Sequence, residues 1–198
     1  MIIGIVLAAG ASRRMGRPKA LLPVGSDTFV GRVCRSAMSA GVADLIVVTA
    51  PGLPSLAEAL RAAGVAARVV ENPTPADGQL SSLRMGLSVA DRPGVEAVLV
   101  NLVDAPLASA ATMRAVVDAF LRTHAPIVRP VAHDGRHGHP VLFARAVFDE
   151  LRLANLAEGA KAVVRAHAAD IADVPVDDEG AFIDIDTPDD YTRVRRWT

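Results

Sequence analysis

The feature that most constrains this chain is a regular alternation of short apolar runs with longer helical segments. Strand-length runs rich in Val, Ile and Leu occur at Ile2–Leu7, Leu45–Thr49, Arg68–Glu71 and Ala97–Leu102. Helices are predicted at Thr28–Ala40, Ser55–Ala63, Leu80–Ala90 and Ala110–Arg122. Apolar runs without strict alternation suit strands that are buried on both faces of a parallel sheet. The chain is therefore predicted to be an α/β protein, a three-layer α/β/α sandwich with a mostly parallel, Rossmann-like sheet.

After Pro126 the regular alternation of predicted strands and helices is lost, but no feature of the sequence marks a boundary between domains. Further strands are predicted at Ile127–Val131, Val141–Phe143, Ile171–Val176 and Phe182–Ile185. Further helices are predicted at Arg145–Leu153, Gly159–His167 and from Pro188 onward. There is no linker, internal repeat or low-complexity tract, and 198 residues fit a single domain. We therefore expect residues 1–198 to form one domain.

Composition and charge exclude several classes of function. The chain has 21 basic and 22 acidic side chains, so it has no global field to hold nucleic acid or an anionic membrane. A single cysteine, Cys34, excludes a disulfide scaffold and a four-cysteine zinc site. The sequence contains no run of about 18 apolar residues, so no membrane span is predicted. The apolar N-terminus lacks a preceding Lys or Arg, which favours a buried strand over a signal peptide. We expect a soluble, cytoplasmic protein.

The segment Ala8–Lys19 lies where ligands of open α/β sheets gather, at the carboxyl end of a strand. It has neither the dinucleotide-binding spacing of glycines nor that of a P-loop. Two glycines could let backbone N–H groups approach an anion, and cations could neutralise phosphate oxygens. The alternative is an ordinary turn with solvated side chains. The segment has no acidic residue and four cations, Arg13, Arg14, Arg17 and Lys19.

Leu7–Leu22 resembles the N-terminal signature of nucleotidyltransferases of GT-A-like fold. It is most similar to the molybdenum-cofactor cytidylyltransferases among the MobA-like nucleotidyltransferases. Related guanylyltransferases usually carry Gly-Gly where this chain has Ala9-Gly10, so the resemblance favours cytosine. In the family this loop wraps the triphosphate, which implies a catalytic, phosphate-binding role for Arg14 and Lys19. The resemblance also implies nucleotide binding by Leu7, Ala8, Ala9, Gly10, Ser12 and Gly16.

A second match lies at Asn72–Leu87, a loop that leads into a predicted helix. Taken alone, the serines of its first turn could bind an anion or a base edge, or simply cap the helix. The segment resembles the family's Asn-Pro…Gly…Ser-Leu…Gly-Leu element, which helps to form the base and acceptor pocket. This implies nucleotide binding by Asn72, Gly78 and Ser82. Pro75 stands where the family often has an aromatic residue, which leaves the acceptor open.

Acidic residues near two predicted strand ends are candidates to hold a divalent cation. Asp104 follows Ala97–Leu102, where a carboxylate could hold Mg²⁺ on a triphosphate or cap a helix. It resembles the family's Asp-x-Pro metal motif. Asp184 and Asp186 would share one face of a strand, and such close like charges favour a nearby cation, although a solvated acidic turn is the alternative. Their segment resembles the family's Asp-Ile-Asp-Thr-Pro ending, which completes a metal site. We expect Mg²⁺, with Mn²⁺ as the alternative.

Three histidines and an aspartate in His133–His139 raise the question of a zinc site. Ligands in a loop without a fixed spacing are weak support for zinc. The Gly138-His139-Pro140-Val141 portion resembles the family's Gly-His-Pro-Val motif, which lies near the acceptor. The resemblance therefore implies acceptor binding by Gly138, His139 and Pro140, and not zinc.

Together the matched segments imply transfer of CMP from CTP to the phosphate of molybdopterin, with release of pyrophosphate. Residues of about 1–107 would form the nucleotide-binding half and residues of about 108–198 the acceptor-binding half. This chemistry needs positioning and charge neutralisation more than a covalent nucleophile. Two alternatives stay open. One is a nucleotidyltransferase of the same fold that uses GTP or another phosphorylated acceptor. The other is a non-catalytic protein that carries the cofactor to a client molybdoenzyme.

Overall fold

A computed structural model describes residues 1–53 and 55–194. Its strands are β1 (Ile2–Ala8), β2 (Pro23–Val24), β3 (Asp27–Thr28), β4 (Asp44–Thr49), β5 (Arg68–Glu71), β6 (Ala97–Leu102), β7 (Ile127–Val131), β8 (Val141–Ala144) and β9 (Ile171–Pro175). Its α-helices are α1 (Phe29–Ser39), α2 (Ser55–Ala62), α3 (Gln79–Ala90), α4 (Ala110–Thr123), α5 (Phe148–Leu153), α6 (Lys161–Ala166) and α7 (Pro188–Val194). Short 3₁₀ helices are η1 (Arg13–Met15), η2 (Lys19–Leu21), η3 (Pro75–Asp77), η4 (Arg145–Val147) and η5 (Glu179–Phe182).

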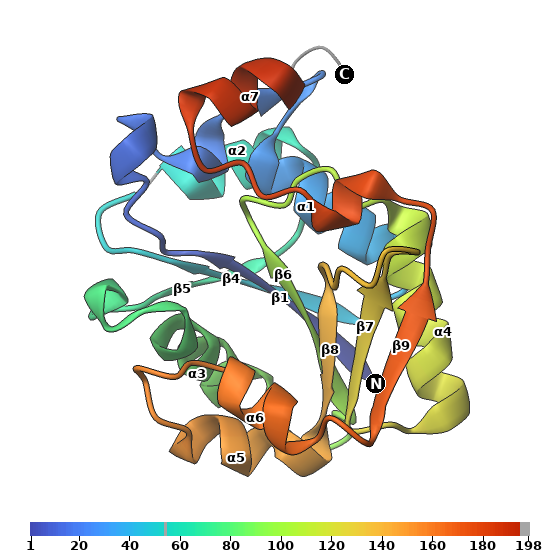
Figure 1. Ribbon diagram of the computed structural model, residues 1–198. Coiled ribbons are helices and arrows are strands. Elements are labelled where there is room, and N and C mark those ends of the chain that lie inside the picture. Colours follow the sequence, from blue (N-terminus) through green and yellow to red (C-terminus); the bar gives the residue numbers. More distant parts are fainter. Residues whose placement is uncertain (54, 195–198) are drawn as a thin grey trace.

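One seven-stranded sheet runs through the described part of the chain, in the order β5-β4-β1-β6-β8-β7-β9 (Figure 1). β1 pairs in parallel with β4 and β6, and β4 pairs in parallel with β5. β8 is antiparallel to both of its neighbours, whereas β7 and β9 are parallel to each other. The predicted mostly parallel sheet is therefore confirmed. Strands from both halves of the chain belong to it, and β2 and β3 form a separate small hairpin that the sequence did not predict.

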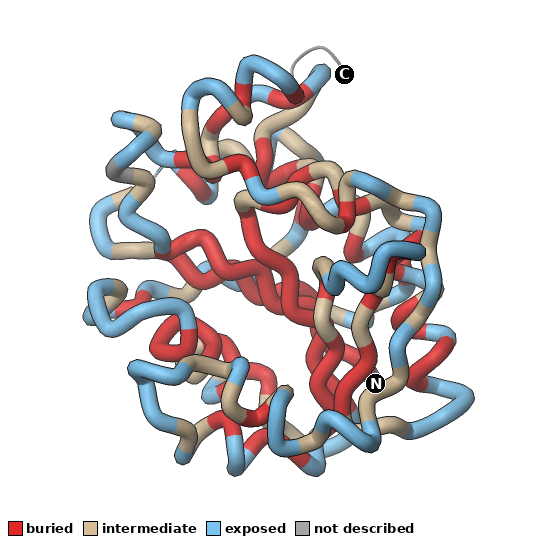
Figure 2. The backbone as a smooth tube through the Cα atoms, in the orientation of Figure 1, coloured by how far each residue is buried: buried red, intermediate tan, exposed pale blue. Residues whose placement is uncertain are grey.

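The sheet separates two apolar cores, which makes the fold a three-layer sandwich as predicted. One core lies under α1, α2, α4 and α7 and includes Phe29, Leu56 and Met113. The other lies under α3, α5 and α6 and includes Leu87 and Phe148. Figure 2 shows the buried strands between these helical layers. β1 is buried along its whole length, because it has a strand on each side and a helical layer on each face. This explains its unbroken apolar sequence.

The strand predicted at Phe182–Ile185 is absent, and this prediction is wrong. The segment is the end of η5 followed by an extended stretch outside the sheet. The backbone here bonds to distant loops. Just before the segment, the Ala181 carbonyl accepts the His139 N–H at 2.8 Å, and within it the Ile185 N–H donates to the Asp104 carbonyl at 2.7 Å. The segment therefore fastens the C-terminal region to the loop after β6. The shared-face argument for Asp184 and Asp186 fails with the strand.

The carboxyl ends of β1, β4 and β6 lie at one edge of the sheet, because these neighbouring strands run in parallel. The loops that follow them are the glycine-rich segment, the segment Ala50–Leu53 and the turn containing Asp104. The fold thus gathers three separate loops at one place. Over the described range, no helix has the length and hydropathy that crossing a membrane requires.

Candidate active site

The glycine-rich loop after β1 is closed on itself by Ser12. The Oγ atom of Ser12 accepts a hydrogen bond from the backbone N–H of Lys19 at 3.0 Å. Ser12 and Gly16 both have left-handed backbones, with φ of 48° and 66°, and they bracket η1. A glycine at the second position avoids the strain that a side chain would add there. The loop therefore folds back so that Lys19 returns to the end of β1.

A pocket opens between this loop and the loop after β4. The predicted residues Ala8, Gly10, Ser12, Gly16 and Lys19 line it. The opposite wall is Ala50–Leu53, which the sequence reasoning missed. The available signal was Pro51-Gly52, which follows the predicted strand Leu45–Thr49 after one residue, because ligands gather at the carboxyl ends of such strands. Of the other predicted loop residues, Ala9 is buried and Leu7 faces a second pocket, described below.

Lys19 lies between two carboxylates that come from distant parts of the chain. Its ammonium group donates to Asp104 Oδ2 at 3.3 Å and also to Asp186 Oδ1. Arg14 donates to Asp186 Oδ2 at 3.0 Å. Only 11% of the Lys19 side chain is exposed, so these charges interact in a partly desolvated setting. The structure thus brings together the four predicted residues Arg14, Lys19, Asp104 and Asp186.

The described contact of Arg17 lies outside this cluster. The guanidinium of Arg17 stacks over the ring of Tyr191 at 5.8 Å. The side chain of Arg13 lies outside the described part of the structure. Of the loop's cations, Lys19 and Arg14 are therefore the ones whose described contacts place them at the acidic residues.

The cluster has more negative charge than its hydrogen bonds balance. Partial desolvation raises the pKa of Asp184, and the carboxylates of Asp104 and Asp186 raise it further. The hydrogen bond from Lys19 is the main reason why the pKa of Asp186 is lowered. Asp104 Oδ1 is buried and has no hydrogen-bond partner. In residues 1–53 and 55–194, no set of three or more acidic, histidine or cysteine side chains converges as a preformed metal site.

Asn72 and Ser82 are bonded to each other. The Nδ2 group of Asn72 donates to Ser81 Oγ at 2.8 Å and to Ser82 Oγ at 3.0 Å, and all three residues are buried. Gly78, with φ of 91°, joins η3 to α3. These contacts fix the loop before α3. Neither Asn72 nor Ser82 lines the pocket at the glycine-rich loop.

The Gly138–Pro140 turn packs tightly on η5. A Cβ atom on Gly138 would collide with the backbone oxygen of Ala181, so this position has no room for a side chain. The His139–Pro140 peptide bond is cis. Burial lowers the pKa of His139 to about 4, against an opposing effect of the Asp104 carboxylate. The imidazole is therefore neutral near pH 7, and its Nδ1 atom has no hydrogen-bond partner.

The three histidines of the loop do not meet at one point. His133 contacts Asp177 at 2.7 Å, and His137 lies 3.6 Å from Asp173. His139 is turned inward toward the pocket.

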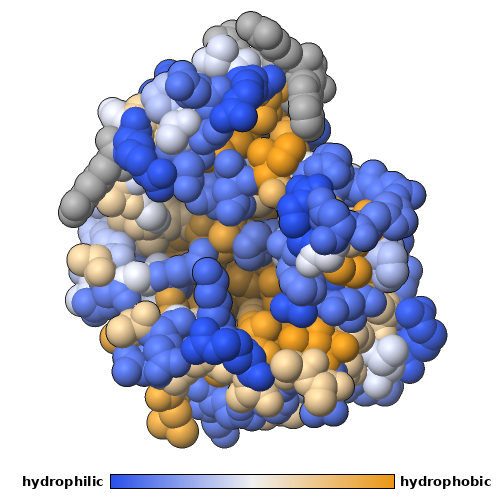
Figure 3. Space-filling view, in the orientation of Figure 1, coloured by the Kyte–Doolittle hydropathy of each residue, from blue (hydrophilic) through white to orange (hydrophobic). Residues whose placement is uncertain are grey.

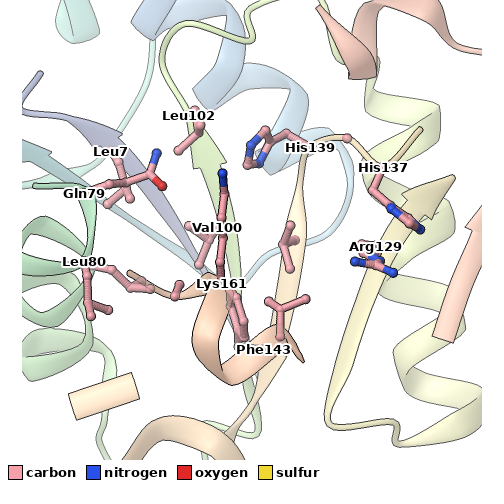
Figure 4. Close-up of a pocket in the computed structure, with 15 residues that line it drawn as sticks. Leu7, Gln79, Leu80, Val100, Leu102, Arg129, His137, His139, Phe143 and Lys161 are labelled. Carbon is pink, nitrogen blue, oxygen red and sulfur yellow. The ribbon is translucent and has the colours of Figure 1, made fainter. Parts of the chain in front are cut away.

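A second pocket, which we call the apolar pocket, lies between α3, α6 and the strands β6 and β8. Figure 3 shows the hollow in this face, with hydrophobic residues on its floor. Its apolar lining includes Leu7, Leu80, Leu83, Val100, Leu102, Val141 and Phe143. Its polar lining consists of Gln79, Arg129, His137, His139 and Lys161 (Figure 4). Of these polar side chains, the sequence reasoning had found only His139.

Most of the chain matches one known protein family. The MobA-like NTP transferase domain matches residues 4–171. The chain belongs to the MobA-like NTP transferase family. The predicted membership of the MobA-like nucleotidyltransferases is thereby confirmed, and the fold agrees with it.

Similar proteins from mycobacteria support the MobA-like assignment. A probable molybdenum cofactor guanylyltransferase of Mycobacterium avium is 36% identical over 137 residues, which are 68% of this chain and 64% of that protein. The crystal structure of Rv0371c from Mycobacterium tuberculosis superposes with a TM-score of 0.82 at 32% identity and covers 98% of both chains. The structure of Rv0371c in complex with manganese gives a TM-score of 0.74 at 32% identity, covering 100% of this chain and 99% of that one. The match thus spans slightly less than two thirds of the curated relative.

Proposed function

We propose that this MobA-like chain transfers a nucleoside monophosphate from a nucleoside triphosphate to the phosphate of a molybdopterin-type cofactor. The observation that carries the proposal is the cluster of Lys19, Asp104 and Asp186 beside the glycine-rich loop. The name of the Mycobacterium avium relative supports both the type of transfer and the acceptor. In this proposal residues of about 1–107 bind the nucleotide and residues of about 108–198 bind the acceptor.

The triphosphate would lie along the glycine-rich loop. The backbone of Leu7, Ala8, Ala9, Gly10, Ser12 and Gly16 would provide close approach and N–H donors. Lys19 and Arg14 now neutralise carboxylates, and both would turn to phosphate oxygens when the nucleotide binds. The loop before α3 would border the nucleotide, and its conformation would be fixed by Asn72, Gly78 and Ser82.

The acidic residues fit a divalent cation bound together with the triphosphate. Asp104 has a buried oxygen without a partner, and Asp184 and Asp186 add charge next to it. Mg²⁺ usually takes only one or two protein carboxylates and completes its shell with phosphate oxygens and water. We propose Mg²⁺, and the manganese complex of Rv0371c supports Mn²⁺ as the alternative. When bound, such an ion neutralises charge on the phosphates and orients them.

The reaction proposed is an in-line displacement at the α-phosphorus. An oxygen of the acceptor phosphate forms the new P–O bond, and the bond to the bridging oxygen of pyrophosphate breaks, with its electron pair leaving on pyrophosphate. An ionised acceptor phosphate carries no proton that must be removed before it attacks, so the reaction needs no general base. The neutral His139 is therefore given no proton-transfer role. Gly138, His139 and Pro140 would form the acceptor side of the site. Lys19 and Arg14 would stabilise charge on the leaving group.

The donor base is the finer part of the proposal. The name guanylyltransferase in the mycobacterial relatives supports GTP, which we take as the first candidate. CTP is the second candidate, because Ala9 stands where the guanylyltransferases usually have glycine.

Pyrophosphate release with molybdopterin and each of the four nucleoside triphosphates tests this function. We expect release with GTP or CTP that depends on Mg²⁺ or Mn²⁺. Release with neither, together with tight cofactor binding, would favour a non-catalytic carrier of the cofactor instead.

A further inference from the structure

Lysine is rare in this chain, and both lysines act on the same acidic cluster. Of the 21 basic residues, only Lys19 and Lys161 are lysines, and the others are arginines. Lys19 bridges Asp104 and Asp186. Lys161 is the first residue of α6, on the other side of the apolar pocket. The positive charges of both lysines oppose the rise in the pKa of Asp184. Lys161 therefore lies close enough to Asp184 for its charge to lower the pKa of that carboxyl.

The Lys161 side chain points into the apolar pocket. Figure 4 shows it extending across the pocket toward Leu102 and His139. The structure gives it no hydrogen bond or carboxylate partner among the described residues. Arg129, on the same pocket, is bonded to Asp173 at 2.7 Å. The ammonium group of Lys161 thus gives the pocket a positive charge, and no carboxylate among the described residues contacts that group.

The pocket combines this charge with extended apolar walls. Leu80 and Leu83 come from α3, and Val141 and Phe143 from β8. Gln79 adds an amide that can both donate and accept a hydrogen bond. A pocket of this kind suits a flat heterocycle with polar edges and an attached anion.

We propose that Lys161 binds the phosphate of the acceptor, while the ring system of the acceptor lies between the apolar walls of this pocket. This inference rests on the proposed function and adds a residue and an orientation to it. The pocket reaches Leu102 at the end of β6, two positions before Asp104. A phosphate on Lys161 would therefore face the residues proposed to hold the triphosphate. A lysine provides a mobile point charge for this purpose, with three rotatable donors.

The first test compares Lys161→Gln with Arg165→Gln. Both substitutions remove one positive charge from α6, but Arg165 does not line the pocket and pairs with Glu158 at 2.8 Å. A hydrogen bond to a charged group is worth about one to two powers of ten in binding. We expect Lys161→Gln to raise the KM for the acceptor about tenfold or more, with the KM for the nucleotide unchanged. Arg165→Gln should change neither. An acceptor KM within twofold of wild type in Lys161→Gln would overturn the inference.

The second test does not depend on turnover. Reductive ¹³C-methylation keeps the charge of amines and labels only the two lysines and the amino terminus. The Lys161 signal, assigned by its loss in Lys161→Gln, should shift when a pterin phosphate monoester is added, whereas GTP or CTP should shift that of Lys19. A pterin phosphate that leaves the Lys161 signal unmoved would contradict the inference. A shift at Lys161 without transfer from any nucleotide would refute the proposed function and keep the inference. Nucleotidyl transfer with an acceptor KM that is unchanged in Lys161→Gln would support the proposed function and refute the inference.

Discussion

Acidification should destabilise this chain through His139. Burial lowers its pKa to about 4 from an ordinary value of 6.5. As the pH falls, the unfolded chain takes up the proton first, because its histidine has the higher pKa. The stability is therefore fully present above pH 6.5 and is lost progressively between pH 6.5 and about pH 4. Comparing proton binding by the folded and unfolded states gives a free energy of unfolding that is about 2 kcal/mol lower at pH 5 than at pH 7.

Denaturant or thermal unfolding at pH 7 and pH 5 measures this loss, with His139→Gln as the test variant. The wild type should lose about 2 kcal/mol more than His139→Gln over this interval, or about 4–8 °C in melting temperature for a chain of this size. His133→Gln is the matched control, because His133 lies in the same loop with 83% of its side chain exposed. It should behave like the wild type. Equal pH dependence in the wild type and in His139→Gln would refute the reasoning.

Three further predictions concern the proposed site. Asp104→Asn should lower metal-dependent turnover about 10²–10³-fold with an unchanged circular dichroism spectrum, and retained activity would contradict its metal role. Lys19→Met should lower the melting temperature, because Asp104 and Asp186 lose their shared ammonium, and added Mn²⁺ should restore it; no response to Mn²⁺ would argue against a cation at these carboxylates. Gly138→Ala should destabilise the fold by about 1–3 kcal/mol, since its Cβ would collide with Ala181, and an unchanged unfolding midpoint would show that the turn can move.

The sheet could be predicted because its central strands are buried on both faces and therefore have unbroken apolar sequences. The central strand β6 begins and ends at the predicted residues and is buried throughout. β7 and the edge strand β5 also have the predicted bounds, although β5 is mostly exposed and was expected to be buried on both faces. Phe182–Ile185 has the apolar composition of a short strand, but the backbone N–H of Ile185 bonds to the carbonyl of Asp104, in a loop far away in the sequence. Periodicity reports which side chains are buried, and it does not report which backbone groups will be available for pairing.

The residues of the site could be predicted because they belong to recognisable motifs. The approach of Lys19 to Asp104 follows from the parallel pairing of β1 and β6. Asp186 instead reaches Lys19 from an extended segment outside the sheet, which strand topology does not predict. Lys161 has no motif of this kind. It reaches the pocket only because α6 packs on the same face of the sheet as α3, a tertiary contact that no local pattern encodes.

The proposed transfer is tested most directly by the mass of the acceptor after incubation. Molybdopterin, Mg²⁺ and the wild-type chain would be combined with GTP, CTP, ATP or UTP in separate reactions and analysed by mass spectrometry. The account predicts that molybdopterin gains one GMP or one CMP, with an equal amount of pyrophosphate released, and that Asp104→Asn forms this product about 10²–10³-fold more slowly. An unmodified acceptor with both GTP and CTP, in the presence of either Mg²⁺ or Mn²⁺, would contradict it.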